Sequence, residues 1–205
     1  MKIDVVNFII SQKTEIKKNI YFITGNERTL MDAVKDKVVN DYKSKNNIVV
    51  EKIKNLSLFK NDIGLFEEKK IYIINEPVSL EEKDLDRLGD FEDIFIFFYE
   101  NSPKTNFLKK LLKNHKGSLL FECYELSKDD KVRILNNWVK TTSTNLSDDV
   151  YWALIDLLDN RFAFLNKELN KLDKLKIKII DIDVINKIIS KNNIMGEKIF
   201  FEILQ

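Results

Sequence analysis

Apolar residues follow two kinds of pattern along the first part of the chain. Short, nearly continuous apolar runs are typical of strands buried on both faces, and they occupy Ile20–Thr24, Ile48–Ile53, Lys70–Ile74, Ile94–Tyr99 and Ser118–Glu122. Between these runs apolar residues recur at helical spacing, which predicts helices at Val5–Ser11, after Gly25, at Leu80–Leu88 and from Pro103. The alternation predicts an α/β domain over residues 1–125, in which helices cover a mainly parallel sheet of five strands. Ile94–Tyr99 is the most apolar run, so we expect it to lie centrally in the sheet.

From Leu126 onward the pattern is helical only. Helices are predicted around Val132–Val139, Val150–Leu158, Phe162–Leu172, Ile182–Ile189 and Glu197–Leu204. Ser147 and Asp181 stand where N-cap residues are expected. Asp159-Asn160 predicts a turn able to adopt left-handed backbone, and Lys140–Asn145 predicts a flexible loop. Residues 126–205 are therefore predicted to form a small helical domain.

Composition narrows the chemistry that this protein can perform. The 205 residues are 44% hydrophobic and 33% charged, and 34 basic against 33 acidic side chains give a net charge of +1. Global attraction to nucleic acid is therefore weak, so any DNA contact must be local or supplied by partners. The single His115 and single Cys123 make neither a metal site nor a disulfide. No apolar run is long enough to span a membrane and the N-terminus lacks the features of a secretory signal, so we expect a cytoplasmic protein.

The segment after Ile20 has the order of strand, glycine turn and helix in which phosphate-binding loops occur. A functional GxxxxGK[ST] loop needs glycines whose amides face the phosphates and a lysine that reaches them. Gly25, Asn26 and Glu27, followed by RTLM, supply one glycine and no lysine. Asn75-Glu76 is also a poor acidic site for a nucleotide-bound metal, which argues against an active P-loop enzyme. We expect a degenerate, non-functional phosphate loop, no intrinsic catalysis, and neither a cofactor nor a metal.

Leu65 and Phe66 stand between Gly64 and the charged run Glu67-Glu68-Lys69-Lys70, where the chain passes into a strand. Adjacent residues on a helix point about 100° apart, so they cannot both lie at the centre of one narrow buried stripe. Two interpretations follow. Either both side chains fold back to cap the sheet, which is the commoner fate of large apolar residues, or they are presented to an apolar pocket of a partner.

Several segments, taken in order, carry a resemblance to a known family. They are YFITGNERTLMDAV from Tyr21, GLFEEKKIYIIN from Gly64, the lysine-rich Phe107–Lys113 with the following Gly117–Phe121, Val132 with Trp138-Val139, and Asn160 with Leu165, Glu168, Leu169 and Leu172. In this order and spacing they resemble the AAA+ clamp-loader family, and more narrowly the delta subunits of bacterial DNA polymerase III. The resemblance covers nearly the whole chain.

The resemblance implies a fold and a mechanism. The fold is an AAA+-like sheet domain followed by a helical lid domain, in a subunit that does not hydrolyse ATP. In this family a Leu-Phe pair is a hydrophobic wedge that enters a pocket of the ring-shaped sliding clamp (beta) and opens the ring for loading on primed DNA during replication. Carried over to this chain, the clamp-binding wedge is Leu65 and Phe66, and the possible rim of the wedge is Glu67, Glu68, Lys69 and Lys70. The resemblance therefore favours an exposed pair.

The resemblance also implies partners. Delta subunits join the other clamp-loader subunits, gamma/tau and delta prime, through a third, C-terminal collar domain. This chain ends at Gln205, just inside a helix that resembles the entry to that domain, so we expect the collar domain to be absent. Primed DNA would be reached indirectly through the clamp, and no membrane would be involved.

The alternative is an AAA+-shaped scaffold or DNA-binding module of unrelated function. Such a module needs a basic, aromatic patch. The lysines of Lys104–Lys116 could form one, although a solvated helix face is the commoner meaning of such a run. The pair Asp148-Asp149 is better explained by its place at a helix N-terminus than by acid/base catalysis.

Overall fold

The computed structural model describes residues 1–11, 18–44, 48–53, 69–75, 80–175 and 179–189. The chain divides into two compact units between Glu125 and Leu126.

A parallel sheet of six strands forms the centre of the first unit. The strands are β1 (Lys2–Ile3), β2 (Ile20–Gly25), β3 (Val49–Ile53), β4 (Lys70–Ile74), β5 (Ile94–Glu100) and β6 (Ser118–Cys123). They lie in the order β1-β6-β2-β5-β4-β3, and each pairs in parallel with its neighbours. The predicted parallel α/β sheet is confirmed, and β5 holds a central position as expected. The additional strand β1 was missed because its two residues are too few to show a periodicity.

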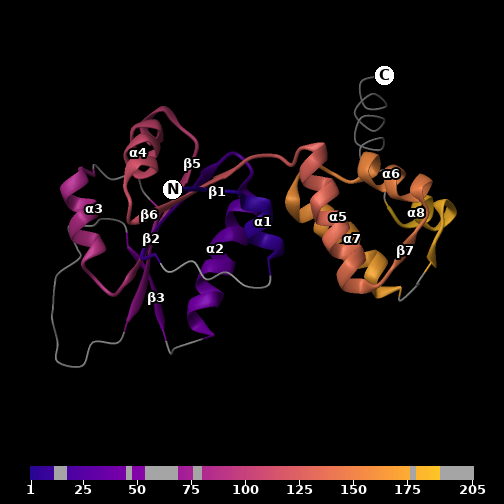
Figure 1. Ribbon diagram of the computed structural model, residues 1–205, viewed down its shortest axis with the longest axis horizontal. Coiled ribbons are helices and arrows are strands. Elements are labelled where there is room, and N and C mark those ends of the chain that lie inside the picture. The colour runs from indigo at the N-terminus through magenta and orange to yellow at the C-terminus, as the bar shows by residue number, and fades with distance from the viewer. Residues whose placement is uncertain (12–17, 45–47, 54–68, 76–79, 176–178, 190–205) are drawn as a thin grey trace, which may run out of the picture. The chain divides into compact units, whose positions relative to one another are not determined.

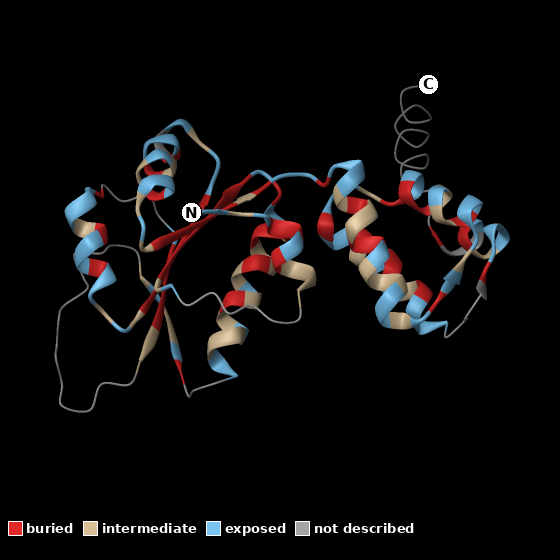
Figure 2. Cartoon of the chain, in the orientation of Figure 1, coloured by how far each residue is buried: buried red, intermediate tan, exposed pale blue. Residues whose placement is uncertain are grey.

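Helices cover both faces of this sheet (Figure 1). On one face lie α1 (Val5–Ile10) and α2 (Arg28–Lys43), where Phe8 packs edge-on against Phe121 with 4.7 Å between ring centroids. On the other face lie α3 (Glu82–Gly89) and α4 (Pro103–Asn114). Their leucines pack against the sheet in one core cluster with Phe22, Phe95 and Phe97. Strands enclosed by two helical layers are buried on both faces (Figure 2), which explains their continuous apolar runs.

The second unit contains the helices α5 (Lys128–Thr142), α6 (Asp148–Leu157), α7 (Phe162–Lys174) and α8 (Ile182–Ile188). Its helices are as predicted, but the expectation of helices only was wrong. β7 (Asn145–Leu146) pairs in parallel with β8 (Ile179–Ile180), and neither strand is long enough to show in the sequence pattern. The helix predicted at Glu197–Leu204 lies outside the described residues.

Helix ends in the second unit differ in part from the sequence predictions. Asp181 caps α8 by accepting the N–H of Val184 at 2.9 Å, as expected. Ser147 stands at the N-cap of α6, but its hydroxyl makes no capping hydrogen bond. The predicted loop at Lys140–Asn145 is confined to Ser143 and Thr144, because α5 continues to Thr142 and β7 begins at Asn145. The hydroxyl of Thr142 donates to the Trp138 carbonyl at 2.8 Å, which holds this residue in the last turn of α5, and the helix ends at Ser143 with a φ of 54°.

The turn at Asp159-Asn160 also forms differently from the prediction. Ser143 is the only non-glycine residue with positive φ in the described part of the chain, so this turn does not use left-handed backbone. Instead the Asp159 carboxylate accepts the backbone N–H of Arg161 at 2.8 Å and its guanidinium at 2.7 Å. The side-chain hydrogen bonds of the aspartate shape the turn.

Candidate functional site: the turn between β2 and α2

The turn between β2 and α2 lies at the carboxyl end of an interior strand, the edge of a parallel α/β sheet where ligands usually bind. Gly25 is paired with Glu100 of β5 on one side and Cys123 of β6 on the other. Its φ is 155°, and a Cβ added to it would lie 1.7 Å from the carbonyl oxygen of Cys123. Only glycine fits this position, because the turn packs directly on the backbone of β6.

The backbone amides of the turn are hydrogen-bonded within the protein. The N–H groups of Asn26 and Glu27 donate to the carbonyl oxygen of Cys123 at 3.1 and 3.2 Å. The N–H of Asn101 donates to the Gly25 carbonyl at 2.8 Å, which ties the turn to the end of β5. In a functional phosphate loop such amides face the phosphates. Here the amides of Asn26 and Glu27 face β6.

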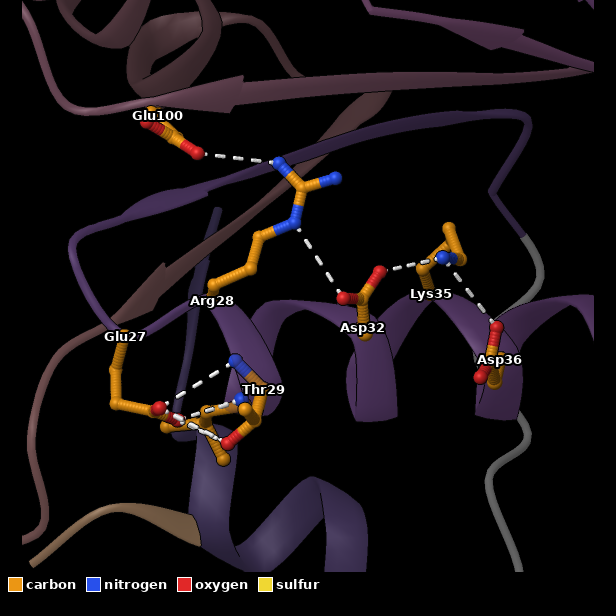
Figure 3. A network of polar contacts seen from close by, with 8 residues as sticks. Glu27, Arg28, Thr29, Asp32, Lys35, Asp36 and Glu100 are labelled. Atoms are coloured by element: carbon orange, nitrogen blue, oxygen red, sulfur yellow. Dashed lines mark hydrogen bonds and ion pairs between the residues drawn. The ribbon is translucent and has the colours of Figure 1, made fainter. Parts of the chain in front are cut away.

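Glu27 places its own carboxylate at the N-terminus of α2 (Figure 3). The residue is only 5% exposed. Its carboxylate accepts the N–H of Leu30 at 2.6 Å and that of Thr29 at 3.3 Å, and the Thr29 hydroxyl donates to both oxygens at 2.9 and 3.0 Å. The free amides of a helix N-terminus attract anions. In this protein that place is held by an anion of the chain itself.

A network of ion pairs continues from this turn along α2 (Figure 3). The Arg28 guanidinium lies 3.3 Å from Glu100 and 3.4 Å from Asp32, and the Lys35 ammonium lies 2.6 Å from Asp32 and 3.5 Å from Asp36. Both cations also face the ring of Phe98, at 4.5 and 5.0 Å from its centroid. The network fastens the first turns of α2 to the end of β5, so the Arg28 cation is engaged by Glu100 and Asp32.

The Cys123 thiol beneath the turn is buried and unreactive. Burial raises the pKa of this thiol, and the nearby carboxylates of Glu27 and Glu122 raise it further. A thiol that stays protonated is a poor nucleophile. The structure therefore gives Cys123 a packing role beside Gly25.

The predicted clamp-binding residues fall mainly outside the described ranges. Leu65, Phe66, Glu67 and Glu68 belong to that group. Lys69 is half-buried immediately before β4. Lys70 opens β4, where its ammonium lies 3.0 Å from Glu51 of β3 and its backbone N–H donates to Asp93 at 2.8 Å. Lys70 lies at the amino end of β4 and Gly25 at the carboxyl end of β2, so these two residues lie at opposite ends of the parallel strands.

Sequence reasoning named Gly25, Asn26 and Glu27 but missed what occupies the turn. Part of the network was readable, since Arg28, Asp32 and Lys35 follow the i,i+4 and i,i+3 spacing of helical ion pairs. The Cys123 carbonyl and Glu100 come from distant strands and left no local signal.

Neither a metal cluster nor a membrane-spanning helix is found among the residues that the structure describes. No group of three or more His, Cys, Asp or Glu side chains there could hold a metal ion. None of the described helices is both long and apolar enough to cross a membrane.

Comparison with known proteins identifies the type of fold. No protein-family model and no curated protein matches the sequence. Among solved structures, the DNA clamp loader delta protein of Bacillus subtilis matches with a TM-score of 0.55 and 15% identity, over 91% of this chain and 67% of that protein. The RuvB Holliday junction branch migration motor of Thermotoga maritima matches with a TM-score of 0.44 and 12% identity, over 82% of this chain and 60% of that protein. The fold of this chain is AAA+-like, and at these identities the likeness is one of fold alone.

Proposed function

We propose that this chain is a clamp-loader delta-like subunit that binds the DNA sliding clamp through Leu65 and Phe66 and opens the ring for loading on primed DNA. One observation carries the proposal. In a fold like that of a clamp-loader delta protein, a Leu-Phe pair stands in the connection that leads into β4. Residues 1–125 would act as the AAA+-like domain and residues 126–205 as the lid domain. Gamma/tau and delta prime would be its neighbours in the loader, joined through a collar domain.

The geometry of the β2–α2 turn supports a subunit that does not hydrolyse ATP. The Asn26 and Glu27 amides face Cys123, and the Glu27 carboxylate occupies the helix N-terminus that a phosphate would need. A nucleotide phosphate would meet a negative charge there, with no lysine of the loop to offset it. In this proposal neighbouring subunits supply ATP hydrolysis.

The apolar pair cannot account for clamp affinity alone. Burying two large apolar side chains contributes about 1.5–3 kcal/mol each, whereas association costs about 4–15 kcal/mol in lost freedom of motion. Rim contacts must therefore contribute. The Lys70 ammonium is already paired with Glu51. The rim residues that we propose to face the clamp are therefore Glu67, Glu68 and Lys69.

Calorimetric titration of this chain with the sliding clamp of its own source tests the proposal. We expect saturable binding, which Leu65→Ala/Phe66→Ala weakens by at least about 2 kcal/mol, the level of interface hot spots. Trp152→Ala is the matched control, because it removes a large aromatic side chain that is 51% exposed in the other unit. The control is expected to bind as the native chain does.

Three outcomes would contradict the proposal. A folded native chain that does not bind the clamp would favour the unrelated scaffold or DNA-binding module. Equal binding by the native chain and the double variant would place the contact elsewhere on the chain. Saturable binding of ATP in a parallel titration would support an active P-loop enzyme, which the geometry of the Gly25–Glu27 turn argues against.

A further inference from the structure

The outward side of α4 carries an aromatic ring among lysines. Leu108 and Leu112 are buried against the sheet, whereas Phe107 is 66% exposed, the largest value among the exposed large apolar residues that the structure describes. Lys110 and Lys113 are exposed as well, as is Lys116 just beyond the helix. Residues three apart lie on one side of a helix, so Phe107, Lys110 and Lys113 form a continuous stripe, and Lys116 follows in the turn after the helix. These residues are called the α4 stripe below.

No described carboxylate neutralises the lysines of the α4 stripe. The segment from Pro103 to Ser118 contains no acidic residue, and within the described ranges Lys110, Lys113 and Lys116 form no ion pair or hydrogen bond. Lys109 behaves differently, since its ammonium lies 2.7 Å from Asn101 and 3.6 Å from Glu122. The three lysines of the stripe are thus not neutralised by any described carboxylate, whereas the neighbouring Lys109, on the inner side of the helix, pairs with Glu122.

Folding accounts for only part of this arrangement. A lysine in the last turn of a helix is favoured by the helix dipole, which explains Lys113. Lys110 lies before that turn, and like charges at i and i+3 oppose each other on a helix. An aromatic ring that remains largely in water gains little from burial. The stripe therefore combines charge repulsion with an exposed ring, and a bound polyanion would relieve the repulsion.

We propose that the α4 stripe binds single-stranded nucleic acid. Lys110, Lys113 and Lys116 contact phosphates of one strand, and the ring of Phe107 stacks on an unpaired base. These are the two contacts by which proteins hold single strands without reading their sequence. Phe107, Lys110 and Lys113 rise by about 4.5 Å per step along the helix axis, so one strand can reach all three. The site goes beyond the clamp-binding role proposed above and does not depend on it.

The chemistry of the stripe favours this ligand over other polyanions. An acidic protein surface would neutralise the lysines but gives no planar group for the Phe107 ring. Stable membrane binding needs a broad apolar face, and the outer side of α4 offers one aromatic residue. Because the net charge of the chain is +1, the chain as a whole adds little attraction for a polyanion. An affinity of about 10–100 μM is therefore expected at low salt.

Fluorescence anisotropy of a labelled oligothymidine, titrated with the full chain over a series of salt concentrations, tests the proposal. Three neutralised phosphates on a single strand predict a slope of log affinity against log salt of about −2. Lys110→Gln/Lys113→Gln is expected to weaken binding at low salt at least about tenfold and to reduce the slope to about −0.7. Phe107→Ala is expected to weaken binding at least about fivefold while leaving the slope unchanged, because a ring contacts bases and not phosphates.

Matched variants separate the stripe from general charge effects. Lys43→Gln/Lys52→Gln removes the same charge from two exposed lysines of α2 and β3, and Trp152→Ala removes an exposed aromatic residue from the other unit. Both are expected to bind as the native chain does, and thermal unfolding verifies that every variant is folded.

Three results would overturn the assignment. They are equal losses in the two lysine pairs, no oligothymidine binding by the folded native chain at low salt, and binding to phosphatidylserine vesicles but not to oligothymidine. The α4 stripe variants are expected to keep the clamp affinity of the native chain. Failure of the stripe proposal is therefore distinguishable from failure of the proposed function.

Discussion

Gly25 and Glu27 decide what the β2–α2 turn can hold. The absence of a side chain at Gly25 lets the turn pack against β6, and the Cys123 carbonyl oxygen then accepts hydrogen bonds from the amides of Asn26 and Glu27. The Glu27 carboxylate accepts hydrogen bonds from the amides of Thr29 and Leu30. Two residues thereby turn a segment shaped like a phosphate loop into a closed helix cap.

Gly25→Ala is expected to be severely destabilising. Its Cβ would lie 1.7 Å from the Cys123 carbonyl oxygen, which belongs to the backbone of a sheet strand and cannot rotate away. We expect a loss of about 3 kcal/mol or more in the free energy of unfolding, at the upper end of overpacking effects. Urea unfolding followed by circular dichroism measures the loss.

Gly89→Ala is the matched control for this prediction. A Cβ at Gly89 meets nothing within 4 Å, and the residue lies in the last turn of α3. This change is expected to be neutral or to stabilise by up to about 1 kcal/mol, because alanine favours the helix. Equal effects of the two substitutions would show that the close contact at Gly25 does not limit stability.

At the scale of elements, Glu122 connects three parts of the first unit. This residue of β6 lies 2.7 Å from the Lys2 ammonium of β1 and 3.6 Å from the Lys109 ammonium of α4. Burial by itself raises the pKa of the Glu122 carboxyl, but the hydrogen bond and charge of Lys2, together with Lys109, outweigh it and leave this pKa below its ordinary value. The carboxylate form is therefore the stabilising form.

Glu122→Gln is expected to have a pH-dependent effect on stability. Because the pKa of Glu122 is lowered in the folded state, its contribution is present above the ordinary value of 4.5 and is lost as the pH falls through the folded-state pKa. At neutral pH we expect a loss of no more than about 1 kcal/mol, since Lys2 is largely exposed to solvent. Urea unfolding from neutral to acidic pH measures the difference from the native chain.

Glu125→Gln provides the comparison for this experiment, because Glu125 is exposed and no described cation pairs with it. It is expected to follow the native chain at every pH. A difference between native and Glu122→Gln proteins that persists below the pKa of Glu122 would contradict the ionic explanation, since the two side chains are then both uncharged.

At the scale of the whole molecule, each unit has a core of its own. In the first unit, residues from β2, β5, α3 and α4 share one buried cluster. In the second unit, Leu135, Leu154, Leu165 and Ile185 are completely buried, and the Lys131 ammonium donates to the Leu158 carbonyl at 3.0 Å. Among the described residues, the members of each of these two sets belong to a single unit.

A fragment of residues 1–125 is therefore expected to fold on its own. We expect a single cooperative unfolding transition with a free energy of about 5–15 kcal/mol, as for other domains of this size. A control fragment of residues 1–117 lacks β6, the strand with which both β1 and β2 pair, and is expected to be unfolded. Circular dichroism with urea unfolding compares the two. A longer fragment that is as unfolded as the shorter one would contradict the separate core.

The amino-acid sequence by itself determined the elements and the class of fold. Apolar runs revealed β2 to β6. In β2, β4, β5 and β6 they reflect burial on both faces, whereas the edge strand β3 is only partly buried. Helical spacing revealed α2, α4 and α7, and Asp181 marked the start of α8. The missing lysine after Gly25 was also visible, since a phosphate loop is a local motif.

Tertiary structure alone decided how these elements meet. The two-residue strands β1, β7 and β8 exist only through their pairing, and Glu100 and Cys123 reach the β2–α2 turn from strands far away in the sequence. The same holds for neighbouring lysines. The Lys109 ammonium pairs with Glu122 of β6, whereas Lys110 on the outer side of α4 pairs with no carboxylate of the described residues. Periodicity along the chain records which face of an element is buried, but the residues that meet that face, and the charges left without a partner, depend on contacts made across the fold.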